Sequence, residues 1–303
     1  MDAAKHDRES VARLMRRATY ASVATAVILI VAKAVAWSLT DSIAMMSSLV
    51  DSLLDSVSSL FNLFAVRFAL EPADAEHRFG HGKLEPLSGL VQSAFIVGSG
   101  VLLLFEAGNR MLFPQPVAEA PFGIAVSVFA IVVTIALVRY QKYVVARSRS
   151  VAINADSLHY TGDIFINLGV IASLAAATWL GFNWIDPIAG AAVGLFLMFN
   201  AVRIGRGSLD MLMDHELPNA DRQRIKAIAM ANPKVLSVHE LKTRASGRDA
   251  FIQLHVEMDG GMTLLQSHTI ADAVEAEIQR AYPAAEIIIH QDPAGVEERH
   301  PDY

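Results

Sequence analysis

Two short stretches carry ionisable side chains at helical spacing inside otherwise apolar segments. Asp51 and Asp55 are four residues apart in VDSLLDS, and His159 and Asp163 are four residues apart in SLHYTGD. Residues four apart lie on the same side of a helix. Each pair therefore presents nitrogen or oxygen donors on one face, which is the donor chemistry that a divalent cation uses.

Charged groups inside apolar segments are unfavourable unless something neutralises them. On insertion scales, three aspartates near the centre of membrane spans would together cost about 7–10 kcal/mol, comparable to the stability of a whole domain. Lys33 is the one nearby cation in the apolar runs. A bound divalent cation would offset the charge, and four N/O ligands suit tetrahedral Zn²⁺. Mg²⁺ prefers six oxygens, so His159 argues against it.

The same residues must also release what they bind. An empty site would hold three carboxylates at close range, and like charges favour protonation of one another. Histidine can take up a proton near neutral pH. Metal–proton exchange is therefore the mechanism that the residues favour. The alternative is that these aspartates hydrogen-bond to neighbouring helices and only pack the bundle, and a pattern that occurs twice weakens it.

Six apolar runs must position these side chains. The chain has 303 residues, of which 53% are hydrophobic and 18% are charged, whereas about a quarter are charged in soluble domains. Each run is close to the ~20 residues that cross a bilayer. The first lacks a convincing small-residue cleavage site and is as long as a full span, unlike a signal peptide. The sequence thus predicts a membrane α-helical bundle of six transmembrane helices. The runs cover residues 18–39, 45–69, 87–112, 121–140, 158–181 and 185–205.

Basic residues predict how the bundle is oriented. Fourteen Lys and Arg flank the spans on one side, and Arg110 stands alone on the other. Such residues favour the cytoplasmic side, so we expect a multi-pass protein with both termini in the cytoplasm. The fourteen are Lys5, Arg8, Arg13, Arg16, Arg17, Arg67, Arg78, Lys83, Arg139, Lys142, Arg147, Arg149, Arg203 and Arg206.

The last third of the chain is polar and of mixed pattern. Residues 1–214 form the predicted transmembrane domain, 215–292 a small cytoplasmic α+β domain in the order αββαβ, and 293–303 a disordered tail. Asn219 is the expected cap of the first helix of the α+β domain, and SGRD is the expected turn between its first two strands. The expected elements are helix 219–232, strands 235–245 and 250–260, helix 263–282 and strand 285–292.

Histidines recur along this α+β domain and in one loop. Strand alternation places His290 and Asp292 on one face, and the recurrence of histidines favours a metal site over a set of ordinary half-buried histidines. The loop PADAEHRFGHGKLEP carries Asp74, His77 and His81, which could chelate if the backbone is helical, although surface loops are rich in such residues. The candidates in the α+β domain are His239, His255, His268, His290 and Asp292.

Several classes of function are excluded or disfavoured. The chain has no Cys, so any metal must be held by His, Asp, Glu or carbonyl groups. The net charge of −6 argues against a nucleic-acid partner. The sequence has no H-E-x-x-H, P-loop or G-x-S-x-G motif, so neither an enzyme nor an ATP-driven pump is expected.

Five motifs in fixed order carry a family resemblance. They are SLVDSLLDS, PADAEHRFGHGKLEPL, ADSLHYTGD, LHVEMDG and IIHQDP. Over nearly the whole chain, the sequence resembles the cation diffusion facilitator family, and most closely its bacterial zinc exporters. The resemblance implies a homodimer of the bacterial inner membrane with a metallochaperone-like cytoplasmic domain. It implies export of Zn²⁺, in some members Cd²⁺ or Fe²⁺, by alternating access against inward proton flow.

The resemblance also implies roles for the candidate residues. It implies a transport site formed by Asp51, Asp55, His159 and Asp163. It further implies a loop metal site, a binuclear site in the cytoplasmic domain, and a charge interlock between Lys83 and Asp214 near the membrane end of the dimer. The loop site is Asp74, His77 and His81, and the binuclear site is His239, His255, His268, His290 and Asp292.

One acidic residue and three other functions stay open. Asp156 lies one turn from His159, and we expect it to line the access path or to cap the helix. A membrane-anchored metal sensor would use the cytoplasmic histidines equally well, but it has no need of acids inside two spans. An intramembrane hydrolase would need an open coordination position and a general base. An exporter of organic cations would not need the histidine-rich sites.

Overall fold

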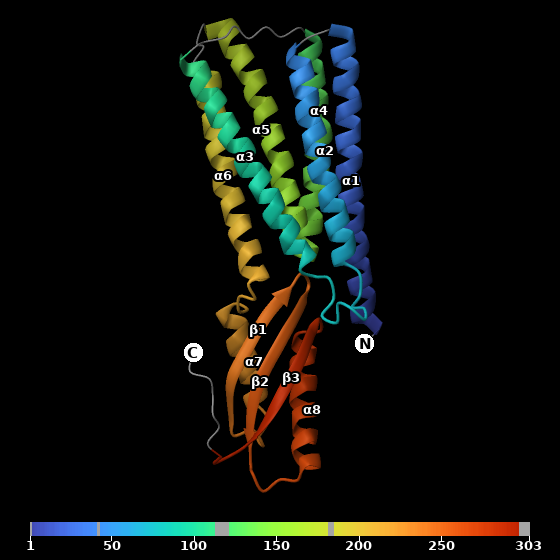
Figure 1. Ribbon diagram of the computed structural model, residues 1–303, viewed down its shortest axis with the longest axis vertical. Coiled ribbons are helices and arrows are strands. Elements are labelled where there is room, and N and C mark those ends of the chain that lie inside the picture. The colour runs from blue at the N-terminus through green and yellow to red at the C-terminus, as the bar shows by residue number, and fades with distance from the viewer. Residues whose placement is uncertain (1, 41–42, 113–120, 181–184, 297–303) are drawn as a thin grey trace. The chain divides into compact units, whose positions relative to one another are not determined.

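The computed structural model describes residues 2–40, 43–112, 121–180 and 185–296. The chain divides into two compact units, Met1–Leu209 and Asp210–Tyr303, each considered by itself. Six long helices make up the first unit (Figure 1). They are α1 (Asp2–Thr40), α2 (Ile43–Ala69), α3 (Leu84–Leu112), α4 (Pro121–Ser148), α5 (Val151–Leu180) and α6 (Ile185–Leu212).

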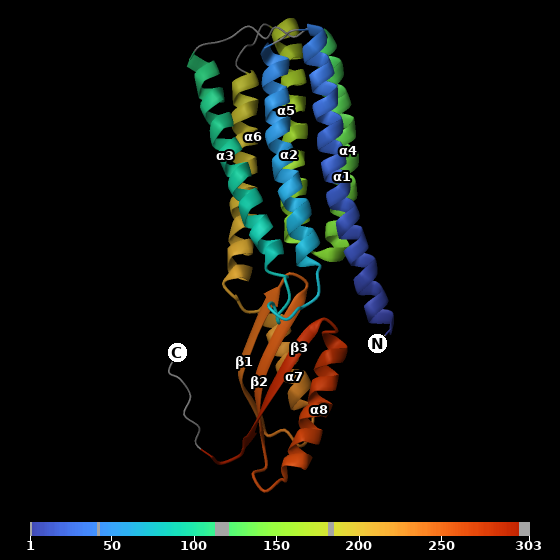
Figure 2. The same ribbon diagram turned by 45° about the vertical axis from the view of Figure 1, so that its right-hand side comes forward.

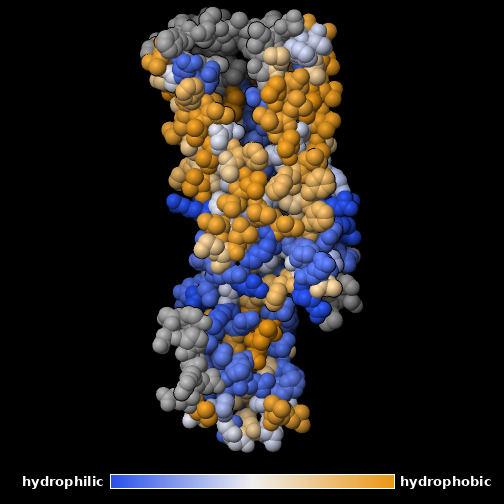
Figure 3. All heavy atoms as spheres, in the orientation of Figure 1, coloured by the Kyte–Doolittle hydropathy of each residue, from blue (hydrophilic) through white to orange (hydrophobic). Residues whose placement is uncertain are grey.

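Length and composition of these helices fit a bilayer. Within the described residues, Glu9–Leu39, Ser48–Ala69, Leu84–Asn109 and Ile124–Ser148 are apolar and long enough to cross a membrane. Helices α5 and α6 have 30 and 28 residues, above the ~20 that a crossing needs. Hydrophobic side chains cover much of the six-helix unit on the face in Figure 3. The predicted six-helix bundle is confirmed.

Prolines in the described helices stand only where a helix tolerates them. Pro86 is in the first turn of α3, Pro121 opens α4 and Pro187 is in the first turn of α6. The first-turn N–H groups have no partner inside the helix, so the N–H that proline lacks costs nothing there. The apolar runs between these starts can therefore continue as unbroken helices.

The helices are longer than the apolar runs. Arg139, Lys142 and Arg147, expected to flank the fourth span, lie within α4, which continues to Ser148. Hydropathy marks only the part suited to lipid, whereas Arg and Lys are good helix formers and extend the helix beyond it. Arg149 then adopts φ 55°, and the Ser150 hydroxyl accepts the Ile153 N–H at 3.2 Å to start α5.

Close packing at the end of the bundle that contains the start of α5 joins four helices. Met15, Val66, Val144 and Ile153, from α1, α2, α4 and α5, form one buried cluster. Helix α5 thereby has a fixed position against α1, α2 and α4 just before its ionisable residues begin.

The second unit is a three-stranded sheet with two helices. Strand order is β1-β2-β3, with β1 and β2 antiparallel and β2 and β3 parallel. Figure 2 shows β2 between its two neighbours. A parallel connection needs a crossover, which α8 supplies. The elements are α7 (Asn219–Met230), β1 (Ser237–Ser246), β2 (Asp249–Met258), α8 (Leu264–Ala281) and β3 (Ala285–Pro293), which confirms the order αββαβ.

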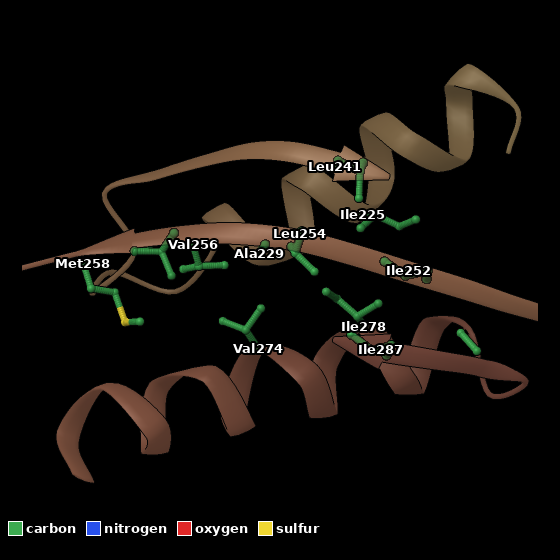
Figure 4. Packing of buried hydrophobic residues seen from close by; sticks show 12 residues of the cluster. Ile225, Ala229, Leu241, Ile252, Leu254, Val256, Met258, Val274, Ile278 and Ile287 are labelled. Atoms are coloured by element: carbon green, nitrogen blue, oxygen red, sulfur yellow. The ribbon is translucent and has the colours of Figure 1, made fainter. Parts of the chain in front are cut away.

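Strand alternation separates the two faces of this sheet. Leu254 and its alternate neighbours on β2 point into the core with Ile225 of α7 and with Val274 and Ile278 of α8 (Figure 4). Both helices therefore pack on one face of the sheet. The other face is left for the side chains between the core residues, among them His255.

Two expectations about segment ends are corrected. Asn219 is not a cap, because Pro218 holds the N-cap position of α7 with no side-chain hydrogen bond. Pro293 ends β3 and the Ala294 N–H donates to the Met258 carbonyl at 2.7 Å, so ordered structure continues into the segment expected as a tail. Residues 297–303 of that segment lie outside the described residues.

Candidate metal centres

Helices α2 and α5 bring three ionisable side chains together inside the bundle. His159 Nε2 lies 3.0 Å from Asp55 Oδ1. Asp55, His159 and Asp163 each offer a ligand atom, and these atoms lie within 4.8 Å of one another. The predicted i,i+4 pair of α5 therefore meets α2. The His159 side chain is only 10% exposed, so a cation here would be largely shielded from water.

Asp51 has a different place from the other predicted ligands. It lies one turn before Asp55 on α2 and is exposed. Four residues of a helix advance by about 6 Å, and the group of mutually close ligand atoms found among the described residues has Asp55 but not Asp51. The structure thus gathers three of the four predicted ligands.

Lys33 of α1 lies against α2 beside these acids. Its Nζ donates to Ser52 Oγ at 2.6 Å and to the Ser48 carbonyl at 3.2 Å. Ser52 lies between Asp51 and Asp55 on α2, so these hydrogen bonds bring the ammonium close to the acids of that helix. The nearby cation predicted from the sequence is therefore held next to the cluster by hydrogen bonds to α2.

Asp156 is a buried connector between helices. Its Oδ2 accepts hydrogen bonds from Ser22 Oγ of α1 and from Gln141 Nε2 of α4, both at 2.6 Å. Tyr160, one turn along α5, contacts Ser59 Oγ of α2 at 2.9 Å and donates to the Ser22 carbonyl at 3.2 Å. Asp156 is 1% exposed, so in this conformation it does not line an open path.

The expectation that Asp156 caps α5 is also wrong. Asp156 is in the second turn of α5, and Ser150 accepts the hydrogen bond at its N-terminus. Sequence reasoning missed its partners on α1 and α4. The available signal was weak: Ser22 and Gln141 are polar residues in or beside apolar runs, and such residues often hydrogen-bond across membrane helices.

The loop between α2 and α3 gathers its three predicted ligands without a helix. His77 Nδ1 lies 3.4 Å from Asp74 Oδ1, and His81 Nε2 lies 3.4 Å from Asp74 Oδ2. Gly80 has φ 75°, a conformation that glycine adopts readily, and it turns the chain so that His81 comes back to His77. The turn at Gly80 therefore brings the three ligands together, where the sequence suggested that a helix would.

Asp74 also organises the loop. Its Oδ1 accepts the N–H groups of His77 at 2.6 Å and of Glu76 at 2.9 Å. The His77 N–H is the main cause that lowers the pKa of Asp74 from its ordinary value of 3.8, because a hydrogen bond to the charged form favours ionisation. The carboxylate is therefore charged and ready to accept a cation at neutral pH.

A third group of close ligands lies on the open face of the sheet. His239 pairs with His255 and His255 with His290 in the strand register, so the three histidines form a row across β1, β2 and β3. Asp292 Oδ2 lies 3.2 Å from His239 Nε2 and 2.8 Å from His255 Nδ1, and its Oδ1 lies 3.0 Å from His290 Nε2. Asp292 is 4% exposed. A buried carboxylate among imidazole nitrogens fits bound Zn²⁺.

His268 is separate from that row. It lies on α8, which packs on the core face of the sheet, and its Nε2 is 3.4 Å from Asp272 Oδ2 on the same helix. Both side chains are 60% exposed. The chain therefore does not bring its own His268 to Asp292, because the sheet lies between them.

The two residues of the predicted charge interlock belong to different units. Asp214 adopts φ 59° and its Oδ1 lies 3.3 Å from Arg244 Nη1 of β1, a partner that the sequence did not indicate. Lys83 precedes α3 in the first unit. The pairing of Lys83 with Asp214 stays a prediction.

Comparisons with known proteins cover both units. The cation efflux transmembrane domain matches residues 19–213, and the cytoplasmic domain of cation efflux proteins matches residues 217–294. The cation-efflux pump FieF of Shewanella oneidensis is 45% identical over 283 residues, which are 93% of this chain and 95% of that protein. FieF of Serratia proteamaculans is 42% identical over 285 residues, which are 94% of this chain and 95% of that protein.

A solved chain of CzrB in its Zn form is also similar. It is 31% identical and aligns over 28% of this chain and 99% of its own length, with a TM-score of 0.27. The full-length relatives and the two domain matches decide the assignment. The chain therefore belongs to the cation diffusion facilitator family, whose members are multi-pass membrane transporters and not enzymes.

Proposed function

We propose that the chain exports Zn²⁺ from the cytoplasm across the bacterial inner membrane in exchange for protons. The observation that carries the proposal is the cluster of Asp55, His159 and Asp163 between two helices of the bundle. The relatives of this chain are named cation-efflux pumps. Intramembrane acids are costly, and a cargo cation that neutralises them explains why they are there.

Asp51 completes the transport site in this proposal. A small shift of α2 along α5 brings its carboxylate to the ion bound by Asp55, His159 and Asp163, giving the four N/O ligands that Zn²⁺ prefers. The three-donor arrangement then corresponds to a state in which the fourth ligand is withdrawn. Gain and loss of one ligand is a physical means of binding the ion on one side and releasing it on the other.

Protons drive the release. When Zn²⁺ leaves, three carboxylates stand together beside one lysine, and protons restore the charge balance that the metal provided. Lys33, held by Ser52, contributes one fixed positive charge in both states. With the basic flanks in the cytoplasm, both termini and the α+β domain are cytoplasmic and zinc moves outward.

The loop and sheet sites have a supporting role. The chain acts as a homodimer in which zinc at His239, His255, His290 and Asp292 stabilises the cytoplasmic domains. The chain's own His268 lies on α8, on the far face of the sheet, and so stands apart from these four residues within one chain. Lys83 and Asp214 lock the membrane end of the dimer.

Zinc flux into proteoliposomes tests the transport site. The wild-type chain should carry Zn²⁺ down an imposed gradient, and Asp163→Ala should abolish the flux. Glu275→Ala, which removes an exposed carboxylate of α8 outside the six-helix unit, is the matched control and should leave flux intact. Normal flux in Asp163→Ala would overturn the site. Zinc binding without any flux in the wild type would support a sensor, and running Cd²⁺ and Fe²⁺ in parallel identifies the preferred cargo.

A further inference from the structure

Strand β1 contains an extra residue beside the row of histidines. His239 pairs with His255 and Lys242 pairs with Gln253, so Glu240 and Leu241 together face the single residue Leu254. Two residues opposite one define a β-bulge. Bulges are frequent next to functional sites, because they turn a side chain to a face that regular alternation denies it.

The bulge decides which face Glu240 joins. His239 points to the histidine face. In a regular strand the next residue, Glu240, would point to the core face, and Leu241 would point to the histidine face. Instead Leu241 is buried in the hydrophobic core with Leu254. The Glu240 carboxylate lies with the histidines, its Oε2 3.6 Å from His255 Nε2.

Glu240 occupies a backbone conformation that a side chain disfavours. Its φ is 44°, in the left-handed region where glycine is the usual residue. A glycine would form the same bulge with less strain. Glu240 therefore adopts this conformation against the backbone preference of a residue with a side chain.

The Glu240 carboxylate faces Nε2 of the His255 ring, and Nδ1 of the same ring faces Asp292. His255 Nδ1 is 2.8 Å from Asp292 Oδ2, and His255 Nε2 is on the Glu240 side. Lys242 Nζ lies 3.8 Å from the same Glu240 Oε2 and supports a negative charge there. A histidine that binds metal through one nitrogen usually donates its other N–H to a carboxylate, which fixes its tautomer and ring orientation.

We propose that Glu240 is a positioning residue of the cytoplasmic metal site. Its carboxylate, at ion-pair distance from His255 Nε2, favours the tautomer that carries the proton on Nε2 and so leaves the Nδ1 lone pair directed at a Zn²⁺ shared with His239 and Asp292. This inference rests on the proposed zinc site on the sheet. It assigns the β1 bulge the task of supplying the orienting carboxylate, and it makes Glu240 part of the site without being a ligand.

The test compares zinc affinity with stability of the zinc-free protein. The full-length chain carries Asp163→Ala and His77→Ala, so that competition with a chromophoric chelator reports the cytoplasmic site. Glu240→Gln and Glu240→Gly should each weaken zinc binding by roughly 10–100-fold, the usual effect of losing such a partner. Glu286→Gln, an exposed carboxylate at the start of β3, is the charge-matched control and should leave affinity unchanged.

Glu240→Gly separates positioning from a purely structural role. Relief of the left-handed strain should keep or raise the unfolding temperature of the zinc-free protein while zinc affinity falls. Affinity within about threefold of the parent in both variants would overturn the proposal, as would a parallel fall of stability and affinity in the glycine variant. Asp292→Ala in the same background tests the site itself: if it leaves zinc binding intact, both the sheet site and the role of Glu240 are wrong.

Discussion

His159 Nε2 of α5 lies 3.0 Å from Asp55 Oδ1 of α2, inside the helical bundle. The two residues lie far apart in the sequence and each belongs to an i,i+4 pair. This contact turns two amphipathic faces into one N/O donor set. Because His159 contacts Asp55 of α2 and lies in one cluster with Asp163 of its own helix, it is the residue whose loss should separate metal binding from helix packing most cleanly.

Replacing His159 by Gln should weaken zinc binding at the transport site by about a hundredfold or more. Loss of an outer partner alone costs roughly 10–100-fold, and His159 is proposed as a direct ligand. Glutamine keeps a hydrogen bond toward Asp55, so the unfolding temperature in detergent should change little. Titration with zinc in an Asp292→Ala and His77→Ala background measures the affinity, and a value equal to that of the parent would remove His159 from the site.

Replacing Asp156 should affect stability more than zinc. In Asp156→Ala the buried donors Ser22 and Gln141 lose their acceptor, which should cost roughly 2–5 kcal/mol of unfolding free energy. Asp156→Asn keeps an oxygen acceptor and should cost less. Thermal unfolding in detergent measures the difference. A loss of zinc affinity in Asp156→Asn as complete as in Asp163→Asn would instead identify Asp156 as a ligand.

The positive charge of Lys33 should lower the affinity of the proposed transport site for Zn²⁺. Removing its positive charge in Lys33→Met should tighten zinc binding by roughly tenfold or more, because a tenfold change corresponds to only about 1.4 kcal/mol and like charges in a partly buried site can repel by several times that. Tighter binding should slow release and lower the maximal flux. Lys33→Arg keeps the charge and is the control. Unchanged affinity in Lys33→Met would show that the ammonium does not act on the ion.

The loop site allows its turn and its ligand to be tested separately. Asp74→Asn keeps an oxygen that can accept the His77 and Glu76 N–H groups, so the turn should survive while metal binding weakens. Asp74→Ala should lose both, seen as faster amide hydrogen exchange over 74–81. Equal exchange in the two variants would show that Asp74 does not organise the turn.

The lowered pKa of Asp74 fixes the sign of the pH effect on that turn. A carboxylate whose pKa falls on folding stabilises the folded loop above its ordinary pKa of 3.8, and this stabilisation is lost only as pH drops through the lower folded value. Amide protection of His77 should therefore be flat between pH 7 and about 5. A midpoint of loss above pH 5 would contradict the hydrogen-bonded, ionised carboxylate.

Periodicity and composition predicted the long helices and the two faces of β2, because these features follow from local geometry. Apolar runs of bilayer length dictate helices, and alternation around His255 dictates which face of β2 meets the core. The i,i+4 spacing placed His159 and Asp163 on one face of α5. These features depend on local geometry, which the sequence carries directly.

The remaining features depend on contacts between distant segments or on local backbone departures. The partners of Asp156 lie on α1 and α4, and no spacing within α5 reveals them. The bulge at Glu240 depends on the pairing of β1 with β2, which regular alternation misreads. His268 lies on the core side of the sheet, away from the row of histidines, because helix α8 packs on that side. This placement is a property of the crossover connection and not of the helix itself.

The most direct test of zinc–proton exchange is transport driven by a pH gradient alone. Proteoliposomes with an acidic lumen and equal zinc inside and outside should accumulate Zn²⁺ above the external concentration, while the lumen loses protons at a matching rate. Asp163→Ala vesicles should do neither. If wild-type vesicles hold zinc at the external concentration whatever the pH gradient, zinc movement is not coupled to protons and the central claim is wrong.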